Sequence, residues 1–189
     1  MESALIVSNK DKSTTYFTVM LNKASIGQIT ALPSCSEARK ILLERDFDLV
    51  IVNVPLRDES GIEFAQRVAA DGVSQIILVV KNEHFDAVSA ICEEYGVLTV
   101  SKPVNNALFW ATLKLAGSAR NRIKRMQEEN NKLKQKIEDI RIIDRAKCLL
   151  ISYCSMDEQE AHRYIEKQAM NLRTTRRAVA EGILHTYEN

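Results

Sequence analysis

Short apolar runs alternate with amphipathic stretches along the first 117 residues. The runs are rich in Val and Ile, which is typical of parallel strands that are covered on both faces. Because stretches of helical spacing separate them, the pattern predicts five strands alternating with five helices in a doubly wound parallel sheet. The predicted strands are 4–7, 26–32, 49–54, 76–80 and 97–100, and the predicted helices are 12–23, 36–45, 60–70, 85–95 and 105–116. Ser34 or Ser36 is a candidate N-cap of the second helix, and Gly96 a stop for the fourth.

A heptad pattern follows this segment. The a positions of the heptad hold two isoleucines and one asparagine, and the d positions hold three apolar side chains. A single Asn at an a position favours two helices paired in one register. The pattern predicts a parallel homodimer, although an amphipathic helix packed on its own N-terminal domain is the alternative. The a positions are Ile123, Asn130 and Ile137, and the d positions are Met126, Leu133 and Ile140.

Three shorter helical segments complete the chain from residue 144 and predict a three-helix bundle. Ser155-x-x-Glu158 matches a capping box for the second of them, and Thr174 or Thr175 can cap the third. Within the second helix, Tyr164 and its apolar neighbours fall on one stripe that we expect to face the core.

The composition, with 46% hydrophobic and 27% charged residues, is that of an ordinary soluble protein. No apolar run is long enough for a membrane span and the N-terminus does not resemble a signal peptide, so we expect a cytoplasmic protein with no membrane partner. The four cysteines form no CxxC motif, which favours buried thiols over metal ligands. We expect no metal and no cofactor. The cysteines are Cys35, Cys92, Cys148 and Cys154.

Charge divides unevenly along the chain. Residues 1–117 carry 11 basic and 14 acidic side chains, net −3, whereas residues 118–189 carry 15 and 11, net +4. From Asp144 onward the count is 7 against 7. A polyanion site therefore depends on where the cations lie rather than on their sum.

Basic side chains gather around the turn between the last two predicted helices. Arginine offers forked donors to phosphates and a stacking plane to unpaired bases, which suits an RNA loop. The third helix carries Ala178 and Glu181 where a reader of the DNA major groove would need base-reading side chains. The candidate RNA-binding residues are Lys147, Arg163, Lys167, Arg173, Arg176 and Arg177.

The first segment resembles the response-regulator receiver domain, a flavodoxin-like fold. The resemblance rests on the order of elements, on Val54-Pro55-Leu56 after the third strand, on the Ser60-Gly61 turn and on Ser101-Lys102-Pro103 after the fifth. In that family an aspartate accepts phosphate, two acids hold a divalent cation, and a hydroxyl and a lysine bind the phosphoryl group. Only the lysine, Lys102, is present here. The other positions are Asn53 for the acceptor, Ser8 and Asn9 for the acids, and Val80 for the hydroxyl.

An amide is too poor a nucleophile to form an acyl phosphate and brings no charge for magnesium. The resemblance therefore implies a degenerate receiver that works without phosphorylation, either as a surface on which a regulatory protein docks or as a dimerisation scaffold.

The last segment resembles the ANTAR family of RNA-binding antitermination domains. The resemblance rests on Arg145-Ala146-Lys147, on the stretch 160–170, on Arg173 and on the stretch 176–181. It implies binding to hairpins of nascent transcripts, which stabilises an antiterminator over a terminator.

The expected organisation is a pseudo-receiver domain at 1–117, a coiled-coil linker at 118–143 and an ANTAR RNA-binding domain at 144–189. The expected function is that of a dimeric antitermination regulator rather than an enzyme. A DNA-binding regulator and an interaction scaffold without nucleic-acid affinity are the alternatives.

Overall fold

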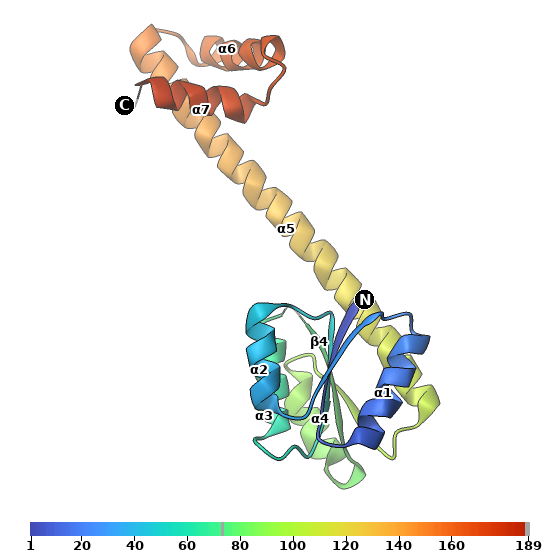
Figure 1. The fold of residues 1–189 in the computed structure, drawn as a ribbon. Coiled ribbons are helices and arrows are strands. Elements are labelled where there is room, and N and C mark those ends of the chain that lie inside the picture. The colour runs from blue at the N-terminus through green and yellow to red at the C-terminus, as the bar shows by residue number, and fades with distance from the viewer. Residues whose placement is uncertain (73, 188–189) are drawn as a thin grey trace. The chain divides into compact units, whose positions relative to one another are not determined.

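The structure, a computed structural model, describes residues 1–72 and 74–187 (Figure 1). The chain divides into two compact units, Met1–Lys124 and Arg125–Asn189. None of the described helices is both long and apolar enough to cross a membrane.

The first unit is built on the predicted five-stranded parallel sheet, and its strands lie in the order β2-β1-β3-β4-β5. The second strand begins two residues later than predicted, because Ser25 adopts a left-handed φ of 60° and the Ile26 N–H donates to Leu21 in the turn that ends α1. The strands are β1 Ser3–Ser8, β2 Gln28–Leu32, β3 Leu49–Asn53, β4 Gln75–Lys81 and β5 Leu98–Lys102.

Helices cover both faces of the sheet. The helix α1 (Asp11–Lys23) and the first part of α5 (Asn106–Cys154) bury Phe17 and Phe109 against one face. On the other face, Cys35 and Phe64 lie in a second apolar core beneath three helices. These are α2 Cys35–Glu44, α3 Gly61–Ala70 and α4 Phe85–Glu93, the last preceded by the 3-10 turn η1 Asn82–His84.

Local chemistry explains where these helices begin and end. Ser34, rather than Ser36, caps α2 by accepting a hydrogen bond from the Glu37 N–H at 3.2 Å. Gly96 follows α4 at a φ of 69°, where a side chain would be strained. At the start of α3, Gly61 is required because a Cβ atom there would overlap the side chain of Val54.

The helix α5 is a single helix of 49 residues. The predicted fifth helix of the sheet domain and the predicted heptad helix are therefore continuous. Its first turns contribute Leu113 to the core of the first unit, and its last turns contribute Ala146 and Leu150 to the core of the second.

In the second unit, α6 (Glu158–Asn171) and α7 (Arg176–Tyr187) pack with the end of α5 as the predicted three-helix bundle (Figure 1). Its buried core is made of alanine side chains and branched aliphatic side chains. The core residues are Ala146, Leu150, Ala161, Ile165, Ala180 and Ile183.

The capping box predicted at Ser155 is wrong. Asp157 caps α6, since its side chain accepts the Glu160 N–H at 2.7 Å while the Glu160 carboxylate accepts the Asp157 N–H at 2.9 Å. Ser155 is unavailable for this role because it adopts a left-handed φ of 54° in the turn after α5. At the next helix, Thr175 accepts the Ala178 N–H at 3.2 Å.

Candidate nucleic-acid interface and the carboxyl edge of the sheet

Two neutral side chains meet at the carboxyl ends of the central strands. Ser8 ends β1 and Asn53 ends β3, and the two residues are paired in register. The Asn53 amide donates to the Ser8 hydroxyl at 2.9 Å, and both residues are buried. The Oδ1 atoms of Asn53 and Asn9 are buried without a hydrogen-bond partner among the described residues. The structure therefore brings together three of the positions singled out in the sequence, and none of them carries a charge.

Three lysine side chains lie near one another at this edge. The ammonium group of Lys102 donates to the Val54 carbonyl. Burial lowers the pKa of Lys102, and the neighbouring charges of Lys10 and Lys81 lower it further. Val80, at the position where the family has a hydroxyl, is buried and offers only methyl groups. The edge thus brings lysine charges together around Lys102 and has no carboxylate at the positions that would accept phosphate or bind magnesium.

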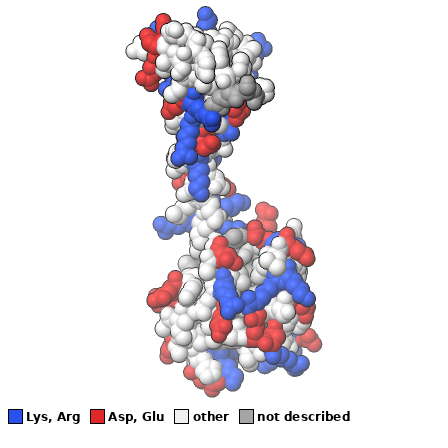
Figure 2. Space-filling model, turned by 90° about the vertical axis from the view of Figure 1, so that its left-hand side faces the viewer, with Lys and Arg blue, Asp and Glu red and all other residues white. Residues whose placement is uncertain are grey.

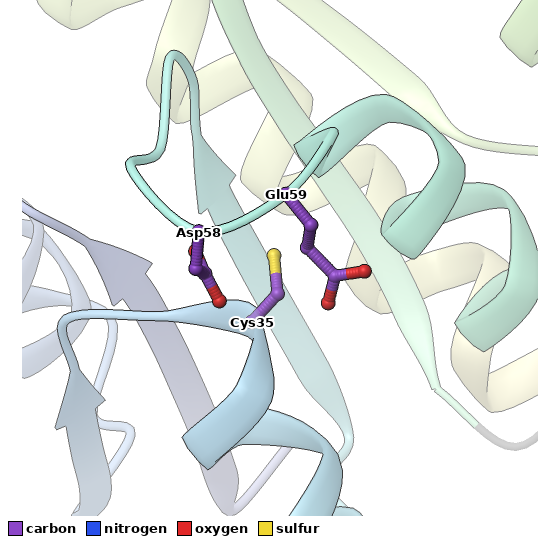
Figure 3. A group of neighbouring side chains, drawn as sticks. All are labelled: Cys35, Asp58 and Glu59. Atoms are coloured by element: carbon purple, nitrogen blue, oxygen red, sulfur yellow. The ribbon is translucent and has the colours of Figure 1, made fainter.

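Cys35, Asp58 and Glu59 place a thiol and two carboxylates within 4.8 Å of one another (Figure 3). Burial, together with the charges of Asp58 and Glu59, raises the pKa of the Cys35 thiol to about 12, so the sulfur is a protonated thiol at neutral pH in the metal-free protein. Both carboxylates have partners already: Asp58 accepts the Ser36 N–H at 2.9 Å, and Glu59 pairs with Arg39 at 2.6 Å. These contacts tie the β3–α3 loop to α2.

Three of the predicted RNA-binding residues line one hollow of the C-terminal bundle. Lys147 of α5 and Arg176 and Arg177 of α7 lie around a space of about 460 Å³, which we call the α5–α7 hollow. Lys147 also lines a second hollow of about 400 Å³ together with Arg163 of α6. The cations thus converge from all three helices of the bundle.

Acidic side chains neutralise these same three cations. Arg177 donates to Asp139 at 2.8 Å and to Glu181 at 2.7 Å, and these bonds raise its pKa. The Asp144 carboxylate, 2.8 Å from the Lys147 ammonium, raises the pKa of Lys147, with Glu158 at 3.4 Å adding to the shift. The third pair joins Arg176 to Glu166 at 3.0 Å.

The other three predicted cations have no ion pair with any described residue. Arg163 and Lys167 are exposed on α6, one turn apart. Arg173 is exposed in the turn that follows α6 and adopts a left-handed φ of 49°. Lys167 and Arg173 do not line either hollow.

Sequence reasoning missed several residues of this surface. Lys136 and His162 line the α5–α7 hollow. The helical spacing of the sequence could have indicated Lys136, because it lies on the same face of α5 as Ile140, Ile143 and Lys147. Tyr164, predicted to face the core, is 38% exposed. It lines a separate groove of about 370 Å³ between α6 and α7.

The predicted seam of α5 is open to solvent. Its apolar side chains are 38–59% exposed, and Asn130 is exposed as well. Figure 2 shows Lys and Arg side chains gathered along one face of this middle part of α5. The seam consists of Ile123, Met126, Asn130, Leu133, Ile137 and Ile140.

Two family models match the chain. The response regulator receiver domain matches residues 4–114, and the ANTAR domain matches residues 131–184. Among characterised proteins, the transcriptional regulatory protein PdtaR of Mycobacterium tuberculosis is 29% identical over 139 residues, which cover 74% of this chain and 68% of PdtaR.

Solved receiver domains share the fold of the first unit. The signal receiver domain of an HD domain-containing protein from Pseudomonas fluorescens Pf-5 superposes with a TM-score of 0.58 at 17% identity, covering 65% of this chain and 91% of that one. The chemotaxis response regulator CheY4 of Vibrio cholerae superposes with a TM-score of 0.53 at 18% identity, covering 61% of this chain and 98% of CheY4. At these identities the likeness concerns the fold alone.

Proposed function

The chain belongs to the response regulators, with an ANTAR domain after its receiver domain, and from this premise we propose that it controls transcription by binding hairpins of nascent RNA as a dimer. The proposed outcome of binding is antitermination, because a hairpin held by protein competes with the terminator. Residues 1–117 would serve as the receiver, 118–143 as a dimerising coiled coil and 144–189 as the RNA-binding module.

The exposed, unpaired cations of the bundle carry this proposal. Arg163, Lys167 and Arg173 have no carboxylate partner among the described residues, so phosphates can approach them without displacing one. Arg173 is the most informative of the three. A side chain in the left-handed region costs roughly 1 kcal/mol relative to glycine, so folding alone favours glycine at this turn. Substitution of Arg173 by glycine therefore separates an effect on RNA affinity from an effect on stability.

Dimerisation would place two bundles on one transcript. The exposed seam on α5 offers apolar side chains that a second copy would cover. Two linked hairpins would then bind with a local-concentration advantage that a single hairpin lacks.

The receiver would act without phosphate transfer. Asn53, Ser8 and Asn9 supply neither a nucleophilic carboxylate nor the charges that hold magnesium. Control would therefore come from a regulatory protein docked on the receiver, from RNA availability or from a ligand.

A pair of glycine substitutions tests the RNA-binding role. Arg173→Gly should weaken binding to RNA hairpins recovered from cell extract by about tenfold, the effect of one lost phosphate contact. It should also raise the stability of the bundle by about 0.5–1 kcal/mol, because glycine relieves the left-handed φ. Ser155→Gly is the matched control, since Ser155 shares the left-handed φ. It should stabilise the bundle and leave RNA affinity unchanged.

The same binding assay separates the proposal from its alternatives. Filter binding or fluorescence anisotropy is measured with RNA hairpins and with duplex DNA at matched salt, since phosphate contacts make both salt-sensitive. Tighter binding to duplex DNA would indicate a DNA-binding regulator. Absence of binding to either, in both variants and the unmodified chain, would indicate an interaction scaffold. Either result contradicts the proposal.

A further inference from the structure

A hollow of about 450 Å³ opens at the carboxyl edge of the receiver sheet. It lies between the β3–α3 loop, the end of β4 and α4, and we call it the α3–α4 hollow. Its volume falls within the range of small-molecule sites, and open α/β sheets bind ligands outside the carboxyl ends of their strands. All of its lining residues belong to the first unit, whereas the proposed RNA-binding residues belong to the second.

The lining of the hollow combines apolar walls with a basic rim. Its walls include the side chains of Leu56, Ile62, Val80 and Val88, which would exclude water from an apolar ligand. Lys81 and His84 supply cationic or hydrogen-bonding groups at the rim. Mostly apolar walls with a few polar groups are the usual composition of a site for a small organic molecule.

Positive charge at the edge favours an anion. Lys81 lies close enough to Lys102 to lower the pKa of Lys102, and the Lys102 ammonium donates to Val54, which also lines the hollow. Glu83 pairs with Lys81 at 2.9 Å and lies 3.3 Å from His84. That carboxylate is exposed, so its pairs contribute little and a bound anion could replace it.

Among the described residues, Glu59 is the only acidic one that lines the hollow, and it does not offset this charge. Its carboxylate accepts two hydrogen bonds from Arg39, at 2.9 and 2.6 Å. A ligand at the Lys81 side of the hollow therefore meets lysine charge on one side and apolar side chains on the other.

We propose that the α3–α4 hollow binds a small organic anion, whose carboxylate or phosphate group lies against Lys81 and whose apolar part contacts Leu56, Ile62 and Val88. A receiver without a phosphate acceptor would then respond to a small molecule bound at the same edge of the sheet. Its ligand would be recognised by charge at one end and by apolar area at the other.

Methyl NMR on the full chain tests this site with three probes. Phenylacetate carries both recognition elements, phenylacetamide only the apolar body, and inorganic phosphate only the charge. At millimolar concentration phenylacetate should shift the methyl signals of Val54, Val80 and Val88, and should bind about tenfold more tightly than phenylacetamide, as expected for one charge-assisted hydrogen bond. Phosphate alone should leave these methyl groups unshifted.

Matched variants locate the binding. Ala87 lines the hollow, whereas Ala90 is exposed on the same helix outside it, so Ala87→Trp should abolish the shifts and Ala90→Trp should preserve them. Lys81→Gln should remove the preference for phenylacetate over phenylacetamide while both still bind. Lys114→Gln, at an exposed position of α5, should change nothing.

Several results would overturn the proposal. One is the absence of shifts at the three valines with any probe, and another is equal affinity for the acid and the amide in the unmodified chain. Equal shifts with inorganic phosphate would show a bare anion site instead. Retained binding in Ala87→Trp would place the probe elsewhere. Because Lys81 is exposed, its substitution should not disturb folding, so the charge test stands even if Ala87→Trp is unstable.

Discussion

At the scale of single residues, the neutral side chains at the ends of β1 and β3 decide what the receiver can do with phosphate. Asn53 donates to Ser8 in the buried space where a carboxylate would otherwise attack a phosphoryl donor. An amide nitrogen shares its lone pair with the carbonyl and is a poor nucleophile. Without adjacent acids, a divalent cation also lacks the oxygen charges that would hold it.

Exposure to a phosphoryl donor should therefore leave the chain unmodified. Incubation with acetyl phosphate and Mg²⁺ should give no mass increase in the intact protein. Asn53→Asp should also remain unmodified, because Ser8 and Asn9 still provide no charge for the metal. Intact-mass spectrometry measures both, with a competent receiver domain as the positive control. A mass increase of one phosphoryl group on the chain that carries Asn53 would contradict the assignment of a degenerate receiver.

The carboxyl ends of β1 and β3 could be placed to within one residue from the sequence, because these strand boundaries follow the apolar runs. The ion-pair partner of a side chain across the bundle could not be predicted in this way. Arg177 pairs with Asp139, which is 38 residues earlier in the chain, and no periodicity links the two positions. The sequence identified Arg177 as basic, but only tertiary packing shows that its charge is shared with Asp139 and Glu181.

At the scale of elements, the start of α6 shows two overlapping signals competing for one role. Ser155-x-x-Glu158 and Asp157-x-x-Glu160 both fit a capping box. The turn after α5 needs a left-handed residue, and Ser155 takes that conformation. The second signal then caps the helix.

Removing that cap should loosen the first turn of α6. Asp157→Ala should cost about 1 kcal/mol of local stability, because the Glu160 N–H loses its acceptor. Amide hydrogen exchange across α6 measures the change without assuming that the two units unfold together. Ser155→Ala is the control and should leave protection in α6 within about 0.5 kcal/mol of the unmodified chain. A larger loss of protection in Ser155→Ala than in Asp157→Ala would instead place the capping box at Ser155.

Most elements could be predicted because their apolar periods are unambiguous, and the misplacements have local causes. The strand β2 starts late because Ile26 is buried in the turn that ends α1, although its side chain extends the apolar run. The exposure of Tyr164 could not be predicted from helical spacing, since the stripe on α6 is wider than the surface its neighbours cover. The α3–α4 hollow likewise depends on how a loop and two helices pack.

At the scale of the whole molecule, the proposed function depends on two copies meeting along α5. Leu133→Asp places a charge at a seam position that is 59% exposed in the single chain and would be covered in a dimer. It should make the protein monomeric in sedimentation equilibrium. Affinity for two linked hairpins should fall by about a hundredfold, and affinity for one hairpin should change little.

Asn131→Asp is the matched control for this substitution. It adds the same charge at an exposed neighbouring position outside the seam, so it should preserve the dimer and its binding to paired hairpins. A dimer that survives Leu133→Asp would place the contact between copies elsewhere.

The shortness of the seam has a consequence for regulation. Three heptads give only marginal association, so by mass action the fraction of paired chains would follow the amount of protein present. A cell that synthesised more of this regulator would then raise its activity more than in proportion, since pairing depends on the square of the monomer concentration. Expression level would itself be an input.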